Sequence, residues 1–414
     1  MSTESWSVRA LGDVSHVEMG QSPPSEFVSD QPGNGIAFLQ GNAEFTSEFP
    51  RPRLWCTRPA KLAKPGDILI SVRAPVGAIN RADRQYGIGR GLAAVRFTGI
   101  DPDYGYHALL RFSAGLHRVS QGTTFDAIGG TELRRLTLPH YPRPEQRRIA
   151  EIFDAADEAI RSTEKIIAKL DRMKQGLLHD LMTRGLDHNG EERDPQRHPE
   201  QFKASPLGRI PKRWAVSLVV NEFDLQLGKM LSGKARQGRN PKPYINNEAL
   251  RWDHVDTSHL PLMDFTSAEQ EKFSLRVGDL LICEGGEVGR AALWRGELDD
   301  CYFQKAIHRL RPTRGYDPRF MLRYLKLAST TRRLVPLTSQ TSIAHLTKEK
   351  LALLPIPVPP EEEQLGISER LDAIDYRIND EGSQLRKLRL LSSGLKDDLL
   401  FGRVPVTIVK GDAA

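Results

Sequence analysis

The chain has 414 residues, 39% of them hydrophobic and 27% charged, with three cysteines and a formal net charge of +6. This length and composition predict two or three globular domains, exclude a disordered chain, and allow a polyanionic partner without requiring one. Because no stretch approaches about 18 apolar residues and the first residues lack a signal-peptide pattern, we expect a cytoplasmic chain with no membrane partner.

Residues 1–143 predict a mixed domain of short strands and helices. The runs "DILISV" and "AAVRF" are typical of strands near glycine-containing turns, whereas "YGYHALLRFSAGLHRV" has helical spacing with basic residues on its polar side. The pattern indicates an α+β (mixed α/β) fold with short twisted sheets.

Several loops of this first domain carry side chains suited to DNA. Arginine and lysine neutralise phosphates or pair with guanine, glutamine and asparagine pair with adenine, and serine or threonine contact either. Taken one at a time, each residue is more typical of a solvated loop, and only their shared placement favours DNA binding. The candidates in the first domain are Arg73, Asn80, Arg81, Arg84, Arg90, Gln121, Thr123 and Thr124.

Residues 144–185 predict one long helix. Pro142 disfavours helix immediately before it, and Glu145 places a negative charge at the positive end of the helix dipole. Apolar residues then recur at alternating steps of four and three, the spacing of a coiled-coil seam. Leu178 and Met182 fall outside this seam, and we expect them to form an exposed docking surface for a partner. The seam positions are Ile149, Phe153, Ile160, Ile167, Leu170, Leu177 and Leu181.

The segment 186–213 is rich in charge, proline, histidine and glutamine, and it predicts an exposed linker. Residues 214–359 predict a second mixed domain, with strands at "DLLICE" and "AIHRLRP" and a helix at "DPRFMLRYLKLASTTRRLV". Its candidate DNA-binding residues are Lys229, Lys234, Arg236, Arg239, Lys242, Gln304, Lys305, Gln340 and Thr341.

Residues 360–403 predict a second long helix, followed by a tail at 404–414. The seam spacing of the first helix recurs here 218 positions later. The two seams either pack on each other, as antiparallel helices related by a pseudo-twofold axis, or each packs on its own globular domain. The second seam consists of Ile367, Leu371, Ile374, Ile378, Leu385, Leu388, Leu395 and Leu399.

The two halves of the chain match one another in order. "KPGDILIS" at 64–71 matches "RVGDLLIC" at 276–283, and "TELRRLTLP" at 131–139 matches "TKEKLALLP" at 347–355. "KQGLLHDLMTRG" near the end of the first helix matches "SSGLKDDLLFGR" in the second. Because the matches keep their order, they indicate two copies of a domain followed by a helix.

The sequence contains no motif for covalent chemistry. It has no GxxxxGK[ST], no Asn/Asp-Pro-Pro-aromatic tetrapeptide and no HExxH. His254 and His259 lie near Asp253 and Asp256, but a solvated polar loop explains that grouping as well. We predict a chain with no catalytic residue, metal or cofactor of its own. The alternatives are a chain with its own methyltransferase or nuclease activity, and a coiled-coil interaction protein without DNA function.

This order of motifs resembles the specificity subunit of type I restriction-modification systems. The resemblance lies in "LP…P…EQ" before each helix, "GL..DL" near its end, and "SPLGRIPKRW" at 205–214 before the second domain. It covers essentially the whole chain.

The resemblance implies that each domain is a target recognition domain reading one half of a bipartite, asymmetric site in double-stranded DNA. The helices would set the gap between the half-sites and dock two methyltransferase (M) subunits. Those subunits would use S-adenosylmethionine to methylate adenine N6, and motor-nuclease (R) subunits would use ATP and Mg²⁺. This chain would supply the choice of sequence and no catalysis.

Overall fold

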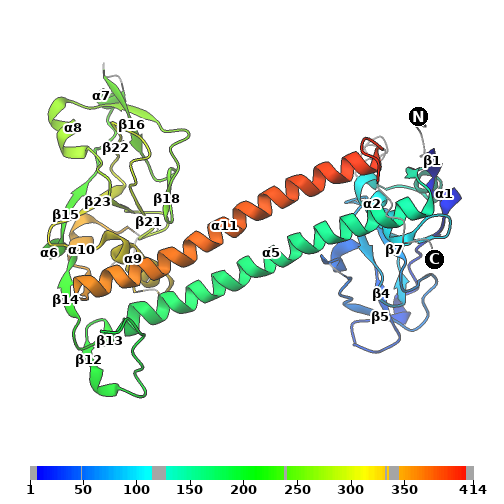
Figure 1. The fold of residues 1–414 in the computed structure, drawn as a ribbon, viewed down its shortest axis with the longest axis horizontal. Helices are drawn as coiled ribbons and strands as arrows, with labels where there is room; N and C mark the ends of the chain where they lie inside the picture. The colour runs from blue at the N-terminus through cyan, green and yellow to red at the C-terminus, as the bar shows by residue number, and fades with distance from the viewer. Residues whose placement is uncertain are drawn as a thin grey trace. The chain divides into compact units, whose positions relative to one another are not determined.

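The computed structural model (Figure 1) divides by its contacts into two compact units, each holding a sheet domain and parts of two long helices. We call residues 1–165 with 383–414 unit 1, and residues 166–382 unit 2. The residues that the structure describes are 7–47, 49–113, 127–236, 240–331, 333–334 and 345–406.

Unit 1 contains small sheets and short helices. Its strands are β1 (Ser7–Ala10), β2 (Ser15–Met19), β3 (Val28–Ser29), β4 (Ile36–Leu39), β5 (Leu54–Cys56), β6 (Leu62–Ala63), β7 (Ile68–Ser71), β8 (Ile79–Arg81), β9 (Tyr86–Ile88), β10 (Leu92–Phe97) and β11 (Thr137–His140). Its short helices are α1 (Leu11–Val14), α2 (Pro102–Phe112) and α4 (Gly130–Arg134), with 3-10 turns η1 (Ser25–Phe27) and η2 (Asn42–Glu44). One sheet has the order β2-β10-β7-β8, a second has the order β3-β5-β4-β9-β6, and β1 pairs with β11.

Unit 2 repeats this plan with additions. Its strands are β12 (Phe202–Ser205), β13 (Gly208–Pro211), β14 (Ala215–Leu218), β15 (Phe223–Leu227), β16 (Pro241–Ile245), β17 (Leu250–Arg251), β18 (His254–Val255), β19 (Leu262–Asp264), β20 (Leu280–Cys283), β21 (Ala291–Leu293), β22 (Tyr302–Phe303), β23 (Ile307–Pro312) and β24 (Pro355–Val358). Its short helices are α6 (Val219–Glu222), α7 (Gly233–Arg236), α8 (Ser267–Phe273), α9 (Pro318–Thr330) and α10 (Lys348–Ala352), with the 3-10 turn η4 (Pro199–Gln201). The sheet β15-β23-β20-β21 has the same order as β2-β10-β7-β8, and β14 pairs with β24 as β1 does with β11.

The continuous apolar runs of the sequence form strands that are buried on both faces. In β7, Ile68 and Ile70 belong to one core cluster and Leu69 to another, because alternate side chains point to opposite faces of a sheet. In β20, Leu280 and Ile282 join one cluster of unit 2 while Leu281 joins the other. Each sheet therefore lies between two cores.

Two long helices, α5 (Arg143–Arg184) and α11 (Glu361–Leu400), run through both units. In unit 1, Lys396 Nζ lies 2.7 Å from Asp157 Oδ1, and Arg389 Nη2 lies 2.6 Å from Glu164 Oε1. The partner number falls along α11 as it rises along α5, so these portions are antiparallel (Figure 1). In unit 2 the end of α5 likewise meets the start of α11, where Leu186 N donates to Glu363 Oε1 over 2.9 Å. The predicted mixed fold, internal repeat and antiparallel helices are confirmed.

The seam residues are buried unevenly. The buried ones are Ile149, Phe153, Leu170, Leu181, Ile367, Leu371 and Leu399. The half-buried ones are Ile160, Ile167, Leu177, Ile374, Ile378, Leu385 and Leu388. Phe153 belongs to the core of unit 1 and Ile367 to that of unit 2, so the seams pack on their own domains near these positions.

Two sequence expectations about the helices were wrong, and the mostly exposed linker has more structure than expected. Leu395 is 40% exposed rather than buried in the seam. Leu178 and Met182 belong to the core of unit 2, because the domain covers this face of α5 near its end. The segment 186–213 is not simply exposed, since it contains the β12–β13 hairpin and its Arg193 is buried.

Candidate nucleic-acid interface

In unit 1, three strand ends meet at one margin of the central sheet. Ala93 at the start of β10 pairs with Met19 at the end of β2, and Leu92 pairs with Ser71 at the end of β7. The segments that follow or precede these strands are joined by backbone hydrogen bonds, such as Val72 N to Gly91 O at 2.9 Å. We call this margin, formed by residues 20–22, 72–77 and 89–91, edge 1.

Edge 1 carries two predicted residues and one, Ser22, that the sequence reading missed, and a second missed residue, Gln40, lies beside it. Arg73 and Arg90 are exposed there. Ser22 Oγ accepts from Arg90 N at 3.4 Å and from Gln40 Nε2 at 2.9 Å, so a hydroxyl and an amide lie beside the basic turn. Ser22 stands two residues after Gly20, which matches Gly228 in the second half of the sequence, whereas nothing in the sequence marked Gln40.

The repeated glycine at each margin is required by close packing of backbone. A Cβ on Gly20 would lie 2.2 Å from Gly89 O, and a Cβ on Gly228 would lie 2.3 Å from Gln304 O. Only glycine, which has no Cβ, allows the two backbone segments at each margin to approach this closely. The Gly20–Gly228 match therefore marks the same turn-to-turn contact in both copies.

In unit 2 the equivalent margin brings together three predicted residues. Leu227 at the end of β15 pairs with His308 of β23. Lys229 forms a parallel β-bridge with Gln304, and Lys305 N donates a hydrogen bond to Lys229 O at 2.7 Å. Lys305 is exposed. We call residues 228–229, 284–289 and 304–306 edge 2.

The charge of edge 2 differs from that of edge 1. Lys229 Nζ donates to Glu269 Oε2 at 2.7 Å and lies 4.9 Å from the centre of the Phe265 ring, so its charge is partly neutralised. Edge 2 also includes Glu284 and Glu287. The two margins share a backbone plan and present different side chains.

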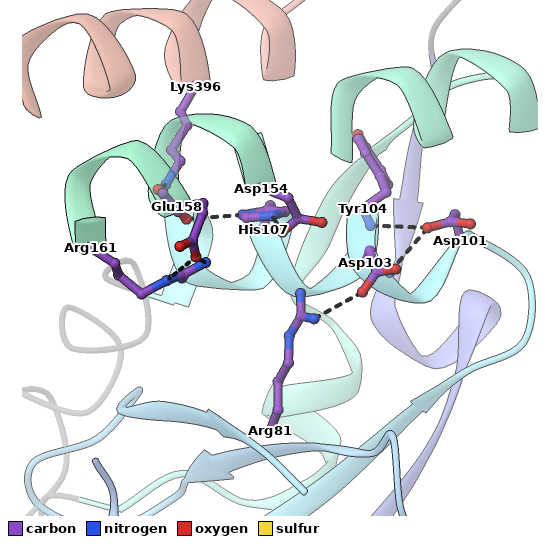
Figure 2. Close-up of polar contacts among 10 residues, drawn as sticks. Arg81, Asp101, Asp103, Tyr104, His107, Asp154, Glu158, Arg161 and Lys396 are labelled. Carbon is purple, nitrogen blue, oxygen red and sulfur yellow. Dashed lines mark hydrogen bonds and ion pairs between the residues drawn. The ribbon is translucent and has the colours of Figure 1, made fainter. Parts of the chain in front are cut away.

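Three predicted residues of unit 1 have their side chains engaged within the fold. Asn80 is 2% exposed and its Nδ2 donates to Thr46 O at 2.8 Å. Arg81 Nη1 lies 2.9 Å from Asp103 Oδ1 (Figure 2), and its guanidinium stacks 3.8 Å from the Tyr106 ring.

Arg84 is the third, because its Nε donates to Tyr86 Oη at 3.3 Å. Of the three, Arg81 belongs to β8, where it pairs with Ile68 at the end of β7 away from edge 1. Sequence composition could not distinguish these structural side chains from contact residues, and the partners of Asn80 and Arg81 come from distant segments.

Of the other predicted residues of unit 2, those that the structure describes lie on α7 and β16. Arg236 is exposed, and Lys242 Nζ lies 3.0 Å from Asp300 Oδ2. The hydrogen bond to Asp300 raises the pKa of Lys242. The described residues do not include Gln121, Thr123, Thr124, Arg239, Gln340, Thr341 or the side chain of Lys234.

Ala127, the first described residue after position 113, forms a β-bridge with Arg73 of edge 1. His345, the first described residue after position 334, forms a β-bridge with Gly285 of edge 2. His308 is fully buried with its Nε2 2.9 Å from Leu346 O, and burial lowers the pKa of His308. A neutral His308 that donates from Nε2 therefore anchors the chain next to edge 2.

No cluster of histidine, cysteine, aspartate and glutamate able to hold a metal occurs among the described residues. The cysteines are free and buried, and burial raises the pKa of Cys301 to about 12 and that of Cys283 above its usual value. The thiols of Cys283 and Cys301 therefore stay protonated at neutral pH, which disfavours nucleophilic chemistry at these two positions. No helix within the described ranges is long and apolar enough to cross a membrane.

Comparison with known proteins supports this two-copy plan. A model of the "type I restriction modification DNA specificity domain" matches residues 3–172 and again residues 211–387. A putative type I restriction enzyme MjaX specificity subunit from Methanocaldococcus jannaschii is 35% identical over 44% of this chain and 43% of its own length. The MjaVIII specificity subunit from the same organism is 23% identical over 74% of this chain and 71% of its own length.

Solved structures show a similar fold. The S subunit of a type I restriction-modification system from M. genitalium has a TM-score of 0.59 at 15% identity, covering 97% of both chains. The HsdS subunit from Thermoanaerobacter tengcongensis has a TM-score of 0.50 at 19% identity, covering 97% of this chain and 98% of that one. With family matches in both halves, the chain belongs to the type I restriction-modification DNA specificity domain family.

Proposed function

We propose that this chain is the sequence-choosing subunit of a type I restriction-modification complex and that each unit reads one half of a bipartite DNA site. The observation that carries the proposal is the pair of equivalent margins, edge 1 and edge 2, with the same backbone plan and different side chains. Arg73 and Arg90 at edge 1 suit phosphates or guanine, while Gln304 at edge 2 suits adenine. Different side chains imply different half-sites and hence an asymmetric target.

The helices α5 and α11, of 42 and 40 residues, are proposed to set the gap between the half-sites and to dock two methyltransferase subunits. Large apolar side chains exposed on these helices support docking, with Met173 at 51% and Leu390 at 75% exposure. The partners would bring S-adenosylmethionine, and motor-nuclease subunits would bring ATP and Mg²⁺. This chain would perform no covalent step.

Replacing Arg90 by alanine should weaken DNA binding and flatten its salt dependence. The logarithm of the binding constant falls as the logarithm of the salt concentration rises, and each phosphate contact that is lost makes this negative slope shallower by about 1. Titration of the complex with its cognate duplex at several salt concentrations measures this slope. Lys203→Ala, which removes an exposed charge on β12, should leave the slope unchanged. An equal effect of both variants would contradict a contact at edge 1.

Inserting one heptad into the middle of both α5 and α11 should lengthen the gap between half-sites without changing the bases that are read. Seven residues add about 10.5 Å of helix, or about three base pairs at 3.4 Å each. Mapping methylated sites in cells that express the variant with its partner gives the new gap. A changed half-site sequence with an unchanged gap would contradict the proposed role of the helices.

An enzymatic role for the chain alone is the competing hypothesis. Incubating the purified chain with DNA and labelled S-adenosylmethionine tests it, and we expect label to enter the DNA only after a methyltransferase subunit is added. Label transferred by the chain alone would overturn the proposed division of labour.

A further inference from the structure

The two copies attach a short helix to a long helix through the same contact. Asp101 caps α2, and Asp317, which lies 216 positions later, caps α9. Asp101 N donates to Gln146 Oε1 of α5 at 2.6 Å, and Asp317 N donates to Gln364 Oε1 of α11 at 2.9 Å. The helices α2 and α9 are therefore equivalent joints between a sheet domain and a long helix.

The second contact of each joint uses different residue types at equivalent positions. In unit 2, Arg323 of α9 lies 2.8 Å from an oxygen of Asp372 and 2.8 Å from one of Asp375, both in α11. Arg323 also lies 3.1 Å from Asp253 Oδ2. The position equivalent to Arg323, 216 residues earlier, is His107 of α2.

His107 meets the equivalent pair of carboxylates in unit 1. Its Nε2 lies 2.9 Å from Asp154 Oδ1 (Figure 2). Its Nδ1 lies 3.8 Å from Asp157 Oδ2. Asp154 and Asp157 are the counterparts of Asp372 and Asp375, 218 positions earlier. The buried Nδ1 has no hydrogen-bond partner among the described residues. A neutral His107 thus donates once, to Asp154, and leaves Nδ1 facing a second carboxylate.

We propose that His107 and Arg323 are equivalent positioning residues that hold each sheet domain against the long helices, and that only the joint of unit 1 responds to protons. The part of this inference that concerns DNA rests on the proposed function. The part that concerns the joints rests on the contacts alone.

The charges around the two residues explain the difference. Burial lowers the pKa of His107, and this effect outweighs the carboxylates of Asp154 and Asp157, which raise the pKa. The positive charge of Lys396 on α11 lowers the pKa further. The rings of Tyr106 and Phe153 also lie beside His107, each with its centre 5.2 Å from that of the imidazole.

Around Arg323, burial also acts to lower the pKa, but three carboxylates together raise it. They are Asp253, Asp375 and Asp372. Arg323 is therefore charged at any ordinary pH, whereas His107 is neutral near pH 7.

The sign of the pH effect follows from the lowered pKa of His107. The pKa of His107 in the unfolded chain is about 6.5. At pH values between this pKa and the lower pKa of the folded chain, the unfolded chain binds more protons than the folded one. The contribution of His107 to stability is therefore complete above about pH 6.5 and is lost as the pH falls through the folded pKa. Acid should weaken the joint of unit 1.

Thermal unfolding of the full chain at pH 7.5 and pH 5.5 tests the joints without DNA. We expect the wild type to lose more Tm on acidification than His107→Gln, because glutamine can still donate to Asp154 and does not titrate. Arg323→Gln should lower Tm at both pH values without changing the pH-dependent loss. The same acid loss in wild type and His107→Gln would overturn the proton-dependent joint.

Footprinting of the complex with its methyltransferase partner tests positioning. His107→Ala should reduce protection over one half-site and Arg323→Ala over the other. Unchanged footprints for both variants, beside a sequence-specific wild-type footprint, would overturn the positioning role and leave the proposed function standing. A wild-type complex without any sequence-specific footprint would instead refute the proposed function, and the unfolding data alone would then decide the inference about the joints.

Discussion

Replacing Glu363 by alanine should lower the free energy of unfolding by about 3–5 kcal/mol, because it leaves a buried arginine without its counter-charge. Glu363 Oε1 accepts hydrogen bonds from Arg193 Nη1 at 2.6 Å, Trp214 Nε1 at 2.8 Å and Leu186 N at 2.9 Å. Arg193 Nη2 adds a bond of 3.1 Å to Glu363 Oε2. One carboxylate thus holds the end of α5, the following segment and the start of the second domain. Denaturant unfolding measures the loss.

Glu362→Ala is the matched control for this prediction. Glu362 lies in the same first turn of α11 but is exposed, so both variants lose a similar interaction with the helix dipole, about 0.3–1 kcal/mol. Only Glu363 has the buried partners. Equal losses for the two variants would contradict a structural role for the buried cluster of Glu363, Arg193 and Trp214.

Replacing Leu170 by aspartate should destabilise the long helices by about 3–5 kcal/mol. Leu170 is 6% exposed on α5, and the change removes its packing while placing a carboxylate in an apolar seam. We expect a lower midpoint of thermal unfolding followed by circular dichroism, together with loss of complex assembly.

Leu390→Asp makes the same chemical change where the side chain is 75% exposed on α11. It should leave unfolding almost unaffected, since substitutions at exposed sites usually alter stability by less than about 0.5 kcal/mol. Similar midpoints for Leu170→Asp and Leu390→Asp would refute a packed seam at position 170. Leu388→Asp, at a half-buried seam position, should fall between the two.

The repeat and the helices were predictable because they depend on local spacing. The apolar steps of four and three predicted the long helices α5 and α11. The matched runs 64–71 and 276–283 contain the strands β7 and β20. The burial of Leu178 and Met182 was not predictable, since it depends on which part of the domain covers the end of α5. Amphipathic spacing identifies a buried face but not every surface that packs against it.

The DNA candidates illustrate the same limit. In the sequence, a basic loop residue that faces solvent is the same residue type as one that contacts an internal partner. Asp103, the partner of Arg81, lies 22 residues away, and Thr46, the partner of Asn80, lies 34 residues away. Pairing of β2, β7 and β10 was needed to collect Arg73 and Arg90 at edge 1 and to reveal Gln40 beside them. The roles of these residues in DNA contact stay predictions.

The equivalence of His107 and Arg323 also needed the structure. The two helices share little sequence beyond the Asp-Pro pair at their start, so residue type alone gave no reason to align a histidine with an arginine. The capping aspartates and the contacts of Gln146 and Gln364 fix the alignment in space.

The central claim is that this chain determines which DNA sequence a type I complex modifies. Mapping N6-methyladenine across the genome of cells that express the chain with its methyltransferase partner tests it most directly. Methylation should fall on one asymmetric two-part sequence with a constant gap and should vanish when this chain is omitted. Methylation at the same positions with and without the chain would contradict the claim.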